Sequence, residues 1–110
     1  MGNFFKKITS NEQLDELIDR SNKEPVAIFK HSTTCPISAG AYREMKSFSG
    51  KLALVEVQNA RELSREIGIR TGIQHESPQV IVLRNGKAVW HASHWEISAD
   101  AVEHAMRESG

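Results

Sequence analysis

The chain has 110 residues, of which 39% are hydrophobic and 25% are charged. This size and composition are typical of one soluble globular domain, which we expect to span residues 1–110. The 14 basic and 14 acidic side chains give a formal net charge of zero. The sequence also has no block of like charges and no apolar run that approaches ~18–20 residues. These features argue against nucleic acid or a membrane as the main partner. Nothing in the composition indicates an oligomeric state.

Helix and strand patterns alternate along the chain. The first clear element is a helix over residues 10–22, because Ser10 and Gln13 have the spacing of a capping box and apolar residues follow at helical intervals. Residues 26–29 are apolar on both faces, as in a central strand. Residues 4–8 add at most a short edge strand.

The middle of the chain predicts a second helix, a strand and a third helix. Pro36 suits the first turn of a helix, where a missing N–H costs nothing, and an apolar stripe then continues to Gly50. Residues 52–57 form a second buried strand in this interpretation. Asn59 is placed to cap the next helix, whose end is weakened by Gly72.

The last part of the chain predicts two strands and a final helix. Residues 80–83 are continuously apolar, and Asn85 with Gly86 is a strong signal for a two-residue hairpin. The second strand of that hairpin begins at residue 87. Ser98 then caps the C-terminal helix.

This order of elements predicts an α/β fold with a four-stranded mixed sheet, with a short fifth edge strand as an option, and with helices on both faces. The two strands joined through a helix should be parallel, whereas the hairpin strands must be antiparallel.

Cys35 is the only cysteine, and it stands where the first buried strand gives way to a helix. A helix N-terminus stabilises a thiolate, so the pKa of Cys35 should fall below the free value of ~8.5. Thr34, Pro36 and Ser38 supply small polar or rigid neighbours, and the Ser38 hydroxyl is one turn away and can point back to the sulfur. The alternative is a buried apolar filler. A lone thiol also favours a reducing compartment, so we expect a cytoplasmic protein.

Two further features carry less information by themselves. Pro78 precedes the third predicted buried strand within residues 75–79 (HESPQ), and base rates alone favour a trans peptide bond there. The five histidines are scattered and one cysteine is too few for a typical zinc site, so no metal is expected.

The strand, the Cys-Pro-x-Ser helix start and the later Ser77-Pro78 together resemble the thioredoxin fold. That resemblance implies that Cys35 is the nucleophile and that Pro78 is a cis-proline beside it, with backbone around the proline pairing with substrate. Ser38 takes the place of the second cysteine of dithiol members, which makes this a monothiol version.

The resemblance extends to the monothiol bacilliredoxins through residues 29–38 (FKHSTTCPIS), 75–79 (HESPQ) and 93–97 (SHWEI). It implies thiol–disulfide exchange in which Cys35 removes bacillithiol from client proteins. Bacillithiol is then a co-substrate, with no bound cofactor, and bacillithiolated proteins are the partners. His75 is then in the loop flanking the site. It either raises the local positive potential, contacts the malate carboxylates of bacillithiol, or is a solvent-facing loop residue.

Two other functions remain open at the level of sequence. An iron–sulfur carrier is one, because residues 35–38 are similar in layout to the Cys-Gly-Phe-Ser site of monothiol glutaredoxins, although Pro36 replaces the glycine. A non-catalytic thioredoxin-like binding module is the other, since loss of the second cysteine fits it as well.

Overall fold

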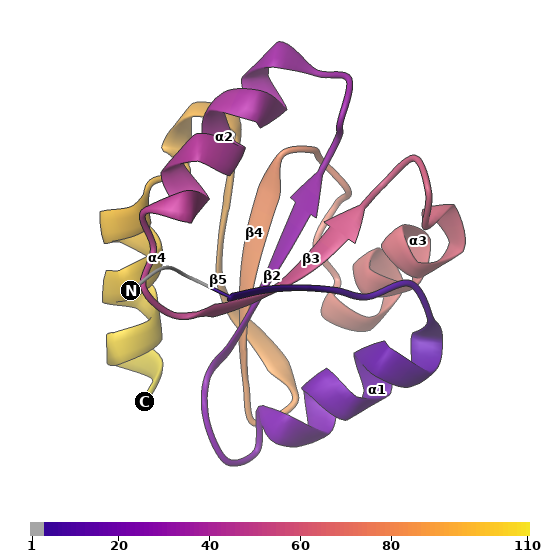
Figure 1. Cartoon of the computed structure of the whole chain (residues 1–110). Coiled ribbons are helices and arrows are strands. Elements are labelled where there is room, and N and C mark those ends of the chain that lie inside the picture. The colour runs from indigo at the N-terminus through magenta and orange to yellow at the C-terminus, as the bar shows by residue number, and fades with distance from the viewer. Residues whose placement is uncertain (1–3) are drawn as a thin grey trace.

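A five-stranded mixed sheet forms the centre of the protein in the computed structural model, which describes residues 4–110 (Figure 1). Its spatial order is β1-β3-β2-β4-β5. β1, β2 and β3 are mutually parallel, and β4 and β5 run antiparallel to their neighbours. The strands are β1 (Phe4–Lys7), β2 (Val26–His31), β3 (Lys51–Glu56), β4 (Gln79–Arg84) and β5 (Lys87–Ser93). The optional edge strand of the sequence prediction is therefore present as β1, and the predicted parallel and antiparallel pairings are confirmed.

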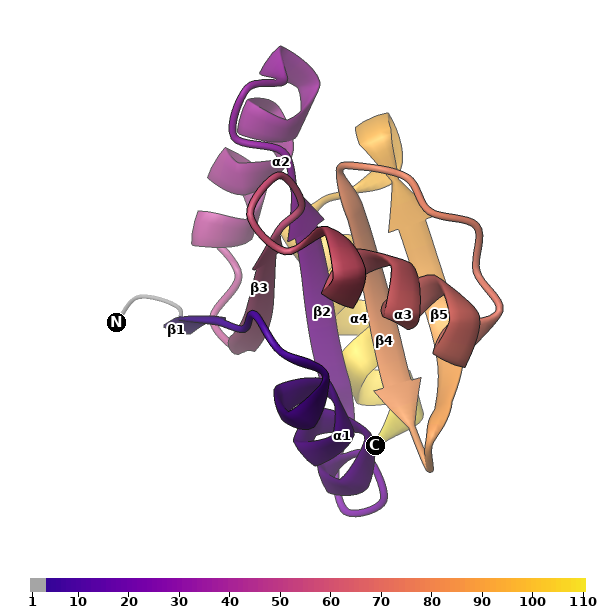
Figure 2. The same ribbon diagram turned by 90° about the vertical axis from the view of Figure 1, so that its right-hand side faces the viewer.

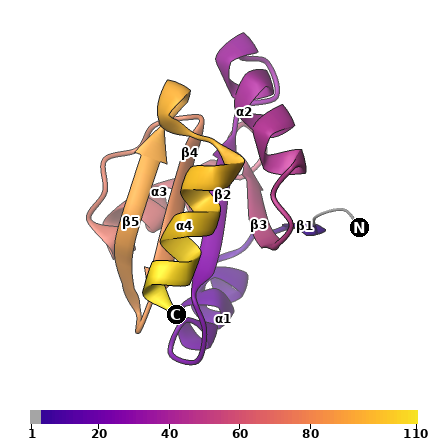
Figure 3. The same ribbon diagram turned by 90° about the vertical axis from the view of Figure 1, so that its left-hand side faces the viewer.

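Helices cover both faces of this sheet, as predicted. α2 and α4 lie on one face (Figure 3), and α1 and α3 lie on the other (Figure 2). The helices are α1 (Asn11–Arg20), α2 (Pro36–Lys46), α3 (Arg61–Thr71) and α4 (Ala99–Ser109), with a short 3-10 turn, η1 (His94–Glu96), after β5. α2 ends at Lys46, before the predicted stop at Gly50. No helix within residues 4–110 combines the length and apolar character that crossing a bilayer requires.

β2 is buried along its whole length because both of its faces are covered. Ala27 and Phe29 point into the core under α2 and α4. Val26 and Ile28 point into the core under α1 and α3. This alternation explains the continuous apolar run of the strand, since helices pack against it on both sides.

Helix capping followed the sequence prediction at two of three positions. Ser10 makes the complete capping box with Gln13, and the Ser98 hydroxyl accepts the N–H of Ala101. The prediction for Asn59 was wrong. α3 starts after Ala60, and the Asn59 side chain donates to Glu56 Oε1 at 3.1 Å instead. The Asn59 amide also donates to the Glu56 carbonyl, so this residue belongs to the turn that ends β3.

The strand register brings distant segments to the same end of the sheet. Lys30 near the end of β2 pairs with Gln79 at the start of β4, and His31 pairs with Glu56 at the end of β3. We call this the cysteine end, because Cys35 follows β2 directly. The opposite end, with the β4–β5 turn at Asn85 and Gly86 and the loop that follows α1, is the hairpin end.

Candidate functional site

Cys35 is the N-cap residue of α2, in the position predicted from the sequence. Its backbone is extended, it is partly exposed, and Pro36 occupies the first helical turn. No side chain caps this helix. The amides of Ile37 and Ser38 fall in the first turn, where the helix offers no carbonyl partner. The thiol therefore lies beside backbone N–H groups that are available to a negatively charged sulfur.

The loop that carries Cys35 is held by one side chain from the neighbouring β3–α3 loop. Gln58 accepts the N–H of Thr33 at 3.2 Å through Oε1. Its Nε2 donates to Ser32 Oγ at 2.9 Å and to Thr34 Oγ1 at 3.0 Å. One amide group thus fixes three successive residues before the cysteine. Sequence reasoning missed Gln58, because nothing in the local pattern indicates a contact that spans more than twenty residues.

Ser38 differs from its expected orientation. It is fully buried, and its hydroxyl accepts the N–H of Ser32 at 2.9 Å and lies 2.9 Å from His31 Nδ1. The hydroxyl therefore ties the start of α2 back to the end of β2, rather than pointing to the Cys35 sulfur. This arrangement arises because the buried His31 and the partly buried Ser32 amide are polar groups that need partners.

His31 is a site residue that the sequence analysis did not single out. Only 8% of it is exposed, and its ring packs 4.8 Å from that of Tyr42 and 5.5 Å from that of Phe29. Burial lowers the pKa of His31, although the charge of Glu56 and the contact with Ser38 oppose that shift. A neutral imidazole in this position provides both a donor and an acceptor nitrogen.

The Ser77-Pro78 peptide bond is cis, as the resemblance implied. Pro78 is buried, and its carbonyl accepts the N–H of His94 at 3.0 Å. Because Gln79 pairs with Lys30, the proline lies at the cysteine end of the sheet. The backbone around Pro78 and the loop of Cys35 are thus brought to one edge from positions more than forty residues apart.

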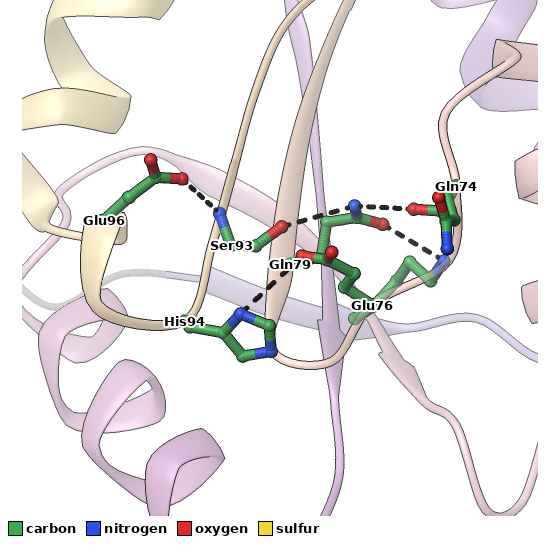
Figure 4. A network of polar contacts seen from close by, with 7 residues as sticks. Gln74, Glu76, Gln79, Ser93, His94 and Glu96 are labelled. Carbon is green, nitrogen blue, oxygen red and sulfur yellow. Dashed lines mark hydrogen bonds and ion pairs between the residues drawn. The ribbon is translucent and has the colours of Figure 1, made fainter.

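A network of polar contacts joins the start of β4, the end of β5 and the segment before Pro78 (Figure 4). Lys30 is fully buried and donates to Gln79 Oε1 at 3.2 Å. Gln79 Nε2 donates in turn to the Gln74 carbonyl at 3.1 Å and to Ser93 Oγ at 3.4 Å. Burial lowers the pKa of Lys30 to about 8. The sequence did contain a signal for this buried pair. Lys30 and Gln79 directly adjoin continuous apolar strands, where a polar residue requires a partner.

The remaining predicted residues lie around the same edge. Ser77 is half-buried next to Pro78. His75 Nδ1 is 3.2 Å from Ser64 Oγ on α3, so this histidine flanks the site through α3. Its pKa is lowered, mainly by partial burial and further by the charge of Lys30, while Glu76 opposes the shift. Within residues 4–110, no group of three or more His, Cys, Asp or Glu side chains is arranged to hold a metal ion.

The fold and the position of Cys35 define a class of protein. A single cysteine at the start of α2, at the same end of the sheet as a cis-proline before β4, is the arrangement of a thioredoxin-fold thiol redox protein. Solved structures agree on the fold. A candidate oxidoreductase with a thioredoxin fold superposes with a TM-score of 0.81 at 34% identity, covering 92% of both chains.

More distant structures show the same fold. Thioredoxin from Trypanosoma brucei brucei matches with a TM-score of 0.72 at 18% identity, over 93% of this chain and 87% of that one. Thioredoxin from Fasciola hepatica matches with a TM-score of 0.69 at 12% identity, over 96% and 99%. The family model described as monothiol bacilliredoxin BrxC matches residues 6–102. The chain therefore belongs to the monothiol bacilliredoxin family.

Proposed function

We propose that this protein is a thiol–disulfide oxidoreductase that removes bacillithiol from protein mixed disulfides through Cys35. The observation that carries the proposal is the placement of Cys35. It is the only cysteine, it is partly exposed, and it stands at the uncapped start of α2. Membership of the monothiol bacilliredoxin family supports the choice of bacillithiol.

In the first step, the Cys35 thiolate attacks the bacillithiol sulfur of the mixed disulfide. A new S–S bond forms between Cys35 and bacillithiol, and the bond between bacillithiol and the client cysteine breaks. The client leaves as a thiolate and takes up a proton. No net oxidation occurs, because one disulfide is exchanged for another.

The second step needs an external thiol, because the chain has no other cysteine. The thiolate of a second bacillithiol attacks the bacillithiol sulfur held on Cys35. This attack releases bacillithiol disulfide and restores the Cys35 thiolate. We further propose a cytoplasmic location, where the protein's lone thiol stays reduced.

The neighbouring residues have separate roles in this proposal. The amides of Ile37 and Ser38 stabilise the thiolate. Thr34, held by Gln58, and Pro36 keep the cysteine at the helix start. The backbone next to Pro78, including Ser77, orients the incoming disulfide.

The test is mass spectrometry of the intact protein after exposure to bacillithiol disulfide, followed by addition of free bacillithiol. We expect one bacillithiol adduct at Cys35, which the added thiol removes. Cys35→Ser is the matched control and should form no adduct. A wild-type protein that stays unmodified, or a Cys35→Ser protein that is modified equally, contradicts the proposal.

A second measurement follows a client protein. A thiol protein carrying bacillithiol should lose it in the presence of the wild-type chain and bacillithiol, and should keep it with Cys35→Ser. Equal release with both proteins means that Cys35 does not catalyse the exchange.

A further inference from the structure

A groove of about 400 Å³ lies beside the N-terminal half of α3, at the cysteine end of the sheet. One wall comes from the β3–α3 loop, and the other from the segment that leads to Pro78. In Figure 2, α3 faces the viewer, with the β3–α3 loop at its N-terminal end and the segment towards β4 leaving its C-terminal end. The lining residues are Val57, Gln58, Arg61, Ser64, Arg65 and His75.

The groove carries positive charge that the protein itself does not neutralise. Arg61 and Arg65 occupy successive turns of α3, are exposed, and make no ion pair with any residue in the described range 4–110. Glu62 is on the same helix but does not line the groove. Of the other neighbouring carboxylates, Glu56 is paired with Lys7 and Glu66 with Arg70. Glu76 lies 3.6 Å from His94 Nδ1 and does not line the groove.

One buried cation adds positive charge near the groove, although it does not line it. Lys30 is fully buried, and its partner is the neutral amide of Gln79 rather than a carboxylate. Its charge reaches His75, where it adds to burial in lowering the pKa of the imidazole. His75 Nδ1 contacts Ser64, which leaves Nε2 without a partner among residues 4–110.

The groove is linked through Gln58 to the loop that carries Cys35. Gln58, which lines it, also hydrogen-bonds to Ser32, Thr33 and Thr34, and Thr34 immediately precedes Cys35. Gln58 therefore forms the border between the Cys35 loop and the groove that Arg61 and Arg65 line.

We propose that this groove binds the dicarboxylate end of the small thiol that reacts at Cys35, with Arg61 and Arg65 as the carboxylate ligands. The inference rests on the proposed function and deepens it, because it assigns the part of the site that selects the thiol. Two guanidinium groups match two carboxylates in number, and each can bind a carboxylate through a pair of parallel hydrogen bonds. The malate end of bacillithiol has this chemistry.

The test compares the rate of adduct formation at Cys35 with disulfides that differ in charge. The variant Arg61→Gln/Arg65→Gln removes two charges from the groove and retains polar side chains. Its matched control, Lys23→Gln/Lys87→Gln, removes two exposed charges near the hairpin end. Each full-length protein reacts with bacillithiol disulfide, with glutathione disulfide, and with the uncharged disulfide of 2-hydroxyethanethiol.

We expect the groove variant to react about tenfold more slowly than wild type with bacillithiol disulfide, because both solvent-exposed arginine–carboxylate contacts are lost. Its rate with the uncharged disulfide should stay within about twofold, since no carboxylate is involved. The control variant should match wild type with both. Equal rates for the groove variant and wild type with bacillithiol disulfide, or equal slowing with every disulfide, overturn the groove assignment.

The glutathione disulfide arm separates failure of the groove from failure of the proposed function. If wild type forms no adduct with bacillithiol disulfide, the bacillithiol function is contradicted. A selective loss of the glutathione disulfide reaction in the groove variant would then still support a carboxylate-binding groove. If wild type reacts with both charged disulfides and neither reaction depends on Arg61 and Arg65, only the groove assignment fails.

Discussion

The two ends of the sheet both contain buried polar groups, but they use them differently. At the hairpin end, the Arg84 guanidinium donates to the carbonyls of Ser21 and Ser109 at 2.9 and 3.0 Å. The Asn85 and Gly86 amides donate to the Ser21 carbonyl and hydroxyl, respectively. These contacts satisfy backbone groups where the chain turns, and a permanently charged arginine suits that purpose.

At the cysteine end, the buried groups are titratable. Lys30 and His31 occupy adjacent positions on β2, on opposite faces of the sheet, and burial lowers the pKa of both. Their partners are the side chains of Gln79 and Ser38 rather than carboxylates. The buried polar groups at the hairpin end thus satisfy the backbone where the chain turns. At the cysteine end, the buried groups are titratable side chains whose desolvation costs free energy, and such groups are typical of functional sites.

The largest expected effect comes from replacing the buried Lys30 at the cysteine end and the partly buried Arg84 at the hairpin end with methionine. Burial lowers the pKa of Lys30 to about 8 in the folded state, whereas the pKa of an unfolded lysine is about 10.4. Between these values the unfolded state binds more protons, so the free energy of unfolding rises with pH, by up to about 3 kcal/mol. Lys30→Met should lose that rise, as measured by urea unfolding across the alkaline range.

Arg84→Met provides the comparison, because arginine stays protonated throughout this range. It should lower the free energy of unfolding at every pH and keep the wild-type rise. An unchanged alkaline rise in Lys30→Met would show that the buried amine does not titrate as described.

The next largest effect compares two fully buried serines. Ser38 and Ser21 are both 0% exposed, and each hydroxyl satisfies a backbone N–H, that of Ser32 or Gly86. Alanine at either position should cost about 1–3 kcal/mol in urea unfolding, because a buried donor loses its partner. Ser38→Ala should also slow adduct formation at Cys35 several-fold, whereas Ser21→Ala should leave that rate unchanged. Equal rates in the two variants would remove the functional distinction between the ends.

Two glycine substitutions should have smaller effects of opposite sign. Gly86 has a φ of 78°, which strains an L-residue, so Gly86→Ala should lower the free energy of unfolding by about 1 kcal/mol. Gly40 lies within α2, where an added methyl group meets only the end of the Arg43 side chain, at 3.9 Å. Gly40→Ala should therefore raise the free energy of unfolding by about 0.5–1 kcal/mol. Thermal unfolding of both variants checks the signs, and stabilisation by Gly86→Ala would contradict the turn geometry.

The smallest effect concerns acid sensitivity at the cysteine end. The pKa of His31 is lowered by burial, so the unfolded state binds protons first as the pH falls below about 6.5. The contribution of His31 to stability is complete above that value and is lost below it. His31→Phe, which can keep the ring packing on Tyr42, should unfold with a shallower acid dependence in urea titrations. The same acid dependence as wild type would contradict a buried, neutral His31.

Local sequence patterns predicted much of the fold for clear reasons. The capping box at Ser10, the Asn85-Gly86 turn and the apolar strand residues 80–83 each act over a few residues, and all three are present in the structure. The prediction that Asn59 caps α3 was wrong because its side chain had two possible local partners. In the structure it hydrogen-bonds to Glu56 in the turn that precedes α3. The local pattern does not rank such alternatives.

The candidate site divides along the same line. The sequence alone determined Cys35 at a helix start with Pro36 behind it, because a strand-to-helix junction and the first-turn preference of proline are local properties. Only the tertiary structure decided three contacts of the site. These are the pairing of Lys30 with Gln79, the contact between Ser38 and His31, and the hydrogen bonds from Gln58 to residues 32–34. These contacts depend on strand register and on burial, which oblige distant polar groups to find partners in one another.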